Sequence, residues 1–193
     1  MTRTEVTRLL EELESGDRAA VGELFDILYA ELTEIADRQR RRWQGNYTLN
    51  TTALVHEAYV RLVDQSRLGV ESQSHFLALA SKVMRHVLCD YARERDARKR
   101  GGGLEQVPLE EVAPVAGTVV FTREESERVV ALDAALKKLE SLDPRKGRIV
   151  ECRFFGGLTV EETAEALGIS TRTVKRDWAL AQAWLQRETA SAS

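Results

Sequence analysis

Cysteine, proline and aromatic residues are scarce in this chain, and each scarcity excludes a class of protein. The 193 residues include 2 Cys, 3 Pro and 12 Gly, and aromatic side chains account for 6% of them. Cys89 and Cys152 lie far apart and form no CxxC pair, so we expect two structural thiols in a reducing compartment. The composition therefore excludes disulfide-rich secreted domains and collagen-like chains.

Long apolar runs are also missing. No run approaches the roughly 18 residues that a membrane-spanning helix needs. The first residues lead directly into charged amphipathic sequence, so we expect no signal peptide. Hydrophobic residues make up 43% of the chain and charged residues 31%. We therefore expect a cytoplasmic protein without membrane insertion.

The spacing of apolar residues predicts an all-α fold. These residues recur at intervals of three and four, whereas the alternation typical of strands is absent. The helices expected in the first half cover residues 6–13, one long segment from a cap at Asp17 to Arg42, residues 51–63, and a long helix from a cap at Ser74 to Arg100.

The nearly neutral net charge of −3 conceals two segments of opposite sign. Residues 82–100 hold seven basic and three acidic side chains, whereas residues 101–128 hold six acidic and two basic ones. Helical periodicity disappears between residues 101 and 123, where glycine and proline are spaced along the chain. We predict two small helical domains, residues 1–100 and 126–193, joined by an acidic flexible linker at residues 101–125.

The most informative motif begins at Leu158. Thr159 and Glu162 have the spacing of a capping box, and Gly168 allows a tight turn. A second helix would follow, burying Val174 and Trp178, so the spacing predicts a helix-turn-helix. Such motifs insert the start of their second helix into the DNA major groove. The candidate DNA contacts on that helix are Ser170, Thr171, Arg172, Thr173, Lys175 and Arg176.

The two halves together resemble a known family. The segments TTALVHEAYVRLV and SHFLALASKVMRHVLCDYARERDARKRGGG are similar to region 2 of bacterial sigma factors. The closest similarity is to the extracytoplasmic-function group, which keeps only region 2, a linker and region 4. The C-terminal segment then resembles region 4, whose helix-turn-helix reads the duplex −35 element. The resemblance runs from about Val6 to Arg187.

This resemblance implies partners and site residues. The chain would bind core RNA polymerase at the β′ clamp helices and the β flap, and would recognise the −10 element of promoter DNA as a single strand. The resemblance assigns polymerase binding to Leu54, Val55, Glu57 and Arg61, and −10 binding to His75, Lys82, Arg85, His86, Arg93 and Arg95. Bond making would belong to the polymerase, so we expect neither enzyme activity nor a cofactor.

The chain departs from the family pattern just before the Leu54-Val55 pair. Typical members carry several acidic residues there, whereas this chain reads Asn50-Thr51-Thr52-Ala53. A phosphoryl group adds about −1.5 to −2 charges, and a helix N-terminus favours such charge. We hypothesise that a Ser/Thr kinase activates the protein at Thr51, expected to project outward as the helix cap, or at Thr52. The alternative is that Thr51 only caps the helix.

Three other functions are alternatives. A stand-alone helix-turn-helix regulator would bind duplex operators as a dimer. An enzyme lacks support, because the sequence shows no carboxylate cluster, Ser/His/Asp pattern or phosphate-binding glycine loop. An anti-sigma factor or adaptor would not need a complete helix-turn-helix. His56, His75 and His86 form no ligand pattern, so we expect no metal.

Overall fold

The structure is a computed structural model that describes residues 3–15, 17, 19–42, 51–64, 70–100 and 123–190. All regular secondary structure in these ranges is helical, which confirms the all-α class. In chain order the elements are α1 (Arg3–Glu14), α2 (Ala19–Ile27), α3 (Tyr29–Arg42), α4 (Thr51–Val63), α5 (Gln73–Arg100), α6 (Arg123–Leu142), α7 (Pro144–Val150), the π-helical turn η1 (Glu151–Phe155), α8 (Val160–Leu167) and α9 (Thr171–Ala190).

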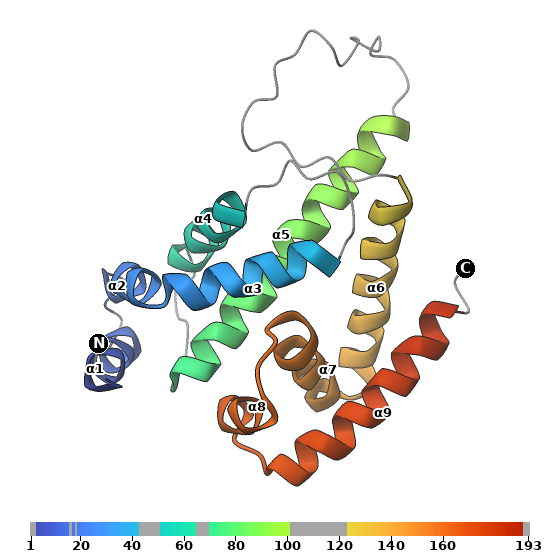
Figure 1. Ribbon diagram of the computed structural model, residues 1–193. Coiled ribbons are helices and arrows are strands. Elements are labelled where there is room, and N and C mark those ends of the chain that lie inside the picture. Colours follow the sequence, from blue (N-terminus) through green and yellow to red (C-terminus); the bar gives the residue numbers. More distant parts are fainter. Residues whose placement is uncertain are drawn as a thin grey trace, which may run out of the picture.

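Helices α1 to α5 share one apolar core. The long α5 packs against α3 and α4, and α1 packs against α2 (Figure 1). Phe76 of α5 lies at the centre of this core, where its ring meets that of Phe25 edge-on with 5.7 Å between centroids. Asp17 accepts a hydrogen bond from the Ala19 amide at 2.9 Å, as expected of the cap before α2.

Two local predictions in this half are wrong. The segment after Asp17 forms two helices that meet at Leu28 instead of one. The break is invisible in the sequence because Leu28 is buried and its backbone still bonds to Leu24 and Leu32. The cap of α5 is Ser72, whose hydroxyl oxygen accepts from the His75 amide at 3.1 Å, whereas Ser74 is buried inside the helix.

Helices α6, α7 and α9 form a second apolar cluster with η1, and α8 packs beside it against Ile149 and Val174. Asp143 caps α7 by accepting from the Lys146 amide at 3.1 Å, and Pro144 follows it at the first helical position. The chain then widens into η1, which turns Phe155 into the core beside Leu136 and Ala181. As a result, η1 buries Phe155 in this cluster and Cys152 in another one, beside Ala78 of α5.

The two halves pack against each other. Helix α5 contacts α6, α8 and η1, and α3 also contacts η1 (Figure 1). The predicted linker falls almost wholly on residues 101–122, outside the described residues. In the described ranges, no helix combines the length and the apolar character needed to cross a membrane.

Candidate functional site

The segment from Thr159 to α9 has the local structure that its sequence predicts. Thr159 accepts from the Glu162 amide at 3.1 Å, and the Glu162 carboxylate accepts from the Thr159 amide at 2.6 Å. Gly168 ends α8 in the left-handed conformation, with φ 62°. Ser170 then caps α9, since its hydroxyl oxygen accepts from the Thr173 amide at 3.2 Å. The result is two helices joined by a short, fully specified turn.

The start of α9 presents a basic face. Val174 is fully buried against Ile149 of α7 and Ala164 of α8. This side of α9 faces the protein, and the opposite side is exposed to solvent. The exposed members of the predicted −35 set are Ser170, Thr171, Arg172, Lys175 and Arg176, whereas Thr173 is half-buried. The Arg176 Nε atom lies 2.8 Å from buried Asp177, which also binds Arg145 at 2.8 Å. These two arginines hold the pKa of Asp177 below its usual value.

The predicted −10 residues lie along α5 and differ widely in accessibility. His75 and Lys82 are half-buried, and the His75 Nδ1 atom lies 3.4 Å from the Glu71 amide. Arg93 is exposed, with one nitrogen 3.4 Å from Asp90. The side chain of Arg95 lies outside the described residues.

Arg85 is the exception in this set, because only 2% of it is exposed. Its guanidinium binds Asp133 of α6 and lies 2.6 Å from Glu151 of η1. Burial lowers the pKa of neighbouring His86 to about 4, aided by the charge of Arg85. Sequence reasoning missed Asp133, although a carboxylate four residues after Val129 on an apolar stripe was an available signal.

The predicted polymerase-binding residues of α4 divide into two groups. Leu54 and Val55 are fully buried in the core of the N-terminal half. A polymerase subunit that binds α4 would therefore contact other residues of this helix. Glu57 and Arg61 reach the surface, where they lie 3.3 Å apart and Arg61 also binds Asp90 at 2.7 Å. The other exposed residues of α4 are Thr52, His56, Tyr59 and Val60, of which the last two are mainly apolar.

A shallow groove of about 360 Å³ lies between α2 and α4. Tyr29, Tyr59 and Val60 line it, and 40%, 37% and 53% of these residues are exposed. The Tyr59 ring stacks edge-on against Phe25 at 5.0 Å. Sequence reasoning missed this groove, because helical spacing identifies the buried stripe and not the apolar residues beside it.

The two candidate phosphorylation sites differ from expectation in their surroundings. Thr51 is the first residue of α4, is half-buried, and donates a hydrogen bond to Asp37. Asp37 also lies 3.6 Å from both Arg40 and Arg41. Thr52 is exposed. Thr51 therefore does not project outward as expected, because α3 covers one side of it.

Comparison with known proteins identifies the family. The model of the ECF sigma factor family matches residues 3–191. The chain belongs to the ECF sigma factor family. It is also similar to an RNA polymerase sigma-E factor of Streptomyces antibioticus, with 34% identity over 111 residues. This match spans 57% of the chain and just over half, 57%, of that relative.

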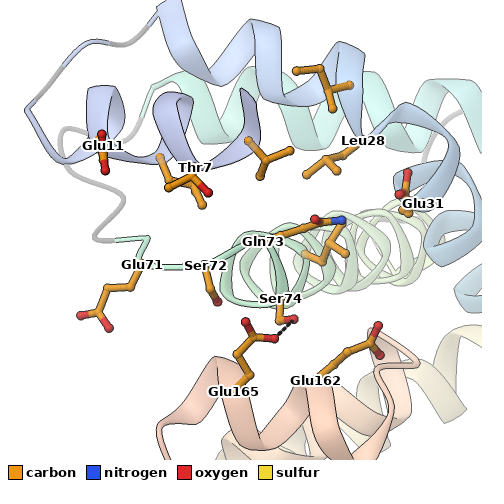
Figure 2. A pocket seen from close by; sticks show the side chains of 14 residues that line it. Thr7, Glu11, Leu28, Glu31, Glu71, Ser72, Gln73, Ser74, Glu162 and Glu165 are labelled. Atoms are coloured by element: carbon orange, nitrogen blue, oxygen red, sulfur yellow. Dashed lines mark hydrogen bonds between the residues drawn. The ribbon is translucent and has the colours of Figure 1, made fainter. Parts of the chain in front are cut away.

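This ECF sigma factor also has an acidic cleft of about 720 Å³ where α1, α2 and the starts of α3, α5 and α8 meet (Figure 2). Its glutamates are Glu11, Glu31, Glu71, Glu162 and Glu165. Ser74 donates a hydrogen bond to Glu165 at 3.0 Å across the cleft. Within the described part of the chain, no three His, Cys, Asp or Glu side chains are close enough to hold a metal ion.

Proposed function

We propose that this ECF sigma factor binds core RNA polymerase and directs it to promoters. The observation that supports the proposal best is the exposed basic start of α9, which buried Val174 fixes to the rest of the protein. A helix held in this way, with Arg172 and Lys175 outward, suits insertion into the major groove of a duplex −35 element. Its side chains would read base edges and bind phosphates there.

The −10 element would be held along α5. Lys82 and Arg93 carry positive charge on this helix, and His75 lies at its start. Contacts of this kind hold the phosphates of a single strand, and they weaken steeply as salt rises. Unstacking the −10 bases costs a few kcal/mol, which these contacts would offset.

The polymerase would bind the surface of α4 and the neighbouring groove. Tyr59 and Val60 supply exposed apolar area there, with Glu57 and Arg61 as a charged border. Aromatic anchors inside a polar border are typical of protein interfaces. This surface suits the β′ clamp helices, whereas the C-terminal helices would contact the β flap.

We further propose that a Ser/Thr kinase activates the protein at Thr51 or Thr52. A phosphoryl group on Thr51 would displace the carboxylate of Asp37 and meet the guanidinium groups of Arg40 and Arg41. It would also supply negative charge at the start of α4. Thr52 is exposed and would be accessible to the kinase. The alternative is that Thr51 only fixes α4 to α3.

A pull-down of core RNA polymerase tests both proposals. Wild type, Thr51→Ala and Thr51→Glu are compared at two salt concentrations, with kinase-treated wild type alongside. Ser141→Glu is the matched control, because it adds the same charge at an exposed site on α6. Tighter binding of Thr51→Glu or of the phosphorylated protein would support the kinase proposal. Equal binding by all forms would remove it, and no binding by any form would remove the polymerase proposal.

A stand-alone regulator remains the second candidate. The exposed start of α9 would serve an operator as well as a −35 element. The discriminating result is specific binding to duplex DNA in the absence of polymerase, together with no binding to polymerase.

A further inference from the structure

Charged and polar side chains are buried where α5 meets the C-terminal helices. Arg85 and Asp133 are both almost fully buried, and Glu151 lies beside them. A buried charge is tolerated when a partner of opposite charge and hydrogen bonds compensate for the lost water. Here each half supplies what the other lacks, since Arg85 comes from α5 and the two carboxylates come from α6 and η1.

Arg85 is held from several directions. One guanidinium nitrogen binds Asp133, and the other lies 2.6 Å from Glu151 and 3.0 Å from His86. The guanidinium also lies over the ring of Phe155, 5.5 Å from its centroid. Exposed Arg93, eight residues further along α5, binds the second oxygen of Asp133. Two of the cations proposed for the −10 strand therefore bind protein carboxylates.

Helix α3 makes a second set of contacts with the same region. Arg38 donates to the Gly156 carbonyl oxygen at 2.9 Å. The buried Gln39 amide lies 3.0 Å from the Ser81 carbonyl oxygen and 3.4 Å from that of Phe155. Gly157 has φ 67°, and a Cβ atom there would overlap the Arg38 guanidinium. These contacts are specific in geometry, which distinguishes them from loose apolar packing.

We infer that this packing is an autoinhibited state for DNA binding. In this state Asp133 and Glu151 bind Arg85, and the C-terminal helices cover the −10 binding surface of α5. The inference rests on the proposed function, because it takes that role of α5 as given. DNA phosphates and the two carboxylates compete for the same guanidinium groups. The hydrogen bonds of Arg38 and Gln39 and the apolar packing favour the closed state until a partner binds the open one.

The same contact explains why opening is attainable. A buried ion pair repays only part of the cost of removing both charges from water. When the halves separate, Arg85, Asp133 and Glu151 are hydrated again. The difference in free energy between the closed and open states is therefore smaller than the number of contacts suggests. If the open state is about 1–10% populated, the apparent affinity for DNA falls about 10- to 100-fold below that of the open state.

The experiment measures closure and binding separately in the full chain. Closure is followed by cross-linking a Ser74→Cys, Glu165→Cys parent with a reducible bifunctional methanethiosulfonate, since these side chains meet at 3.0 Å far from Arg85. The parent also carries Cys89→Ala and Cys152→Ala, because both native thiols are buried at the contact that opens and would become reactive in the open state. Binding is followed with a fluorescent dT oligonucleotide.

Two variants open the contact from opposite sides. Asp133→Asn removes the carboxylate that binds Arg85 and Arg93, and Arg38→Ala removes the donor to Gly156. Glu188→Gln is the matched control for Asp133→Asn, because its partner Lys138 lies in the same half of the protein. Circular dichroism melting identifies a variant that has lost its fold, in which case the other variant carries the test.

Support requires slower cross-linking of Asp133→Asn and Arg38→Ala than of the parent, together with oligonucleotide binding about tenfold tighter. The cross-linked parent should bind weakly and recover on reduction. Parental cross-linking rates in both folded variants would overturn the inference, as would opening without any gain in DNA binding. Tighter DNA binding by the open forms without binding of core polymerase would support the inference while overturning the proposed polymerase partner.

Discussion

Glu151 should make the stability of this protein depend on pH in the opposite direction to an ordinary surface carboxylate. Burial raises the pKa of Glu151 from 4.5 to about 7. The positive charges of Arg85 and Lys82 on α5 oppose this shift, whereas Glu140 of α6 adds to it. Because the folded state holds the proton more tightly than the unfolded chain, the stabilising contribution is complete below pH 4.5 and is lost as pH rises through about 7.

The size of this effect follows from the pKa difference. One pKa unit corresponds to about 1.4 kcal/mol, so the Glu151 contribution taken alone should fall by roughly 2–3 kcal/mol of unfolding free energy between about pH 5 and about pH 8. His86 acts in the other direction, since burial and the charges of Arg85 and Lys82 lower its pKa from 6.5 to about 4. Its contribution is present above pH 6.5 and is lost as pH falls through 4.

Between pH 4.5 and 6.5 the two residues therefore oppose each other, and wild-type stability should change little. Glu151→Gln keeps the shape of the protonated acid and cannot titrate. Its stability should be flat above pH 6.5 and should fall on acidification below that, which exposes the effect of His86. Urea unfolding midpoints measured across this range give both profiles. Parallel profiles for wild type and Glu151→Gln would refute the reasoning, and Glu188→Gln serves as the surface control.

Three further predictions concern α8 and α9. Thr159→Ala removes the capping box and should cost about 1 kcal/mol of unfolding free energy in urea titrations; an unchanged midpoint would contradict the cap's role. Gly168→Ala should cost about 1–2 kcal/mol because of its positive φ alone, since a Cβ there meets no atom within 4 Å. Arg172→Ala and Lys175→Ala should each lower the salt dependence of duplex DNA binding by about one in the log–log slope, whereas Arg187→Ala at the far end of α9 should not.

The parts that the sequence predicted well are those set by local physics. Apolar spacing gave α4 its observed bounds, and the cap at Thr159 and the turn at Gly168 form as their side chains require. The break at Leu28 was missed because the buried stripe passes through it without interruption. Side-chain periodicity locates a helix face, but it does not say what covers that face.

The contacts between the halves show this limit most clearly. Arg85 and Asp133 are 48 residues apart, on two helices that each read as amphipathic by themselves. The basic residues of α5 therefore predict a surface for nucleic acid, and nothing in the sequence of α5 itself indicates its contact with α6. Asp133 occupies a position on the apolar face of α6. A charged residue at such a position indicates that a buried residue of opposite charge lies elsewhere in the protein.

The most direct test of the central claim is transcription from a library of genomic fragments by core RNA polymerase, with RNA 5′ ends mapped by sequencing. Wild type and Asp133→Asn are both added, so that the closed state cannot hide activity, and the double variant Arg172→Ala, Lys175→Ala is the control. The account predicts new start sites that share upstream −35 and −10 sequences and that disappear with the double variant. No protein-dependent start sites with either form would contradict it.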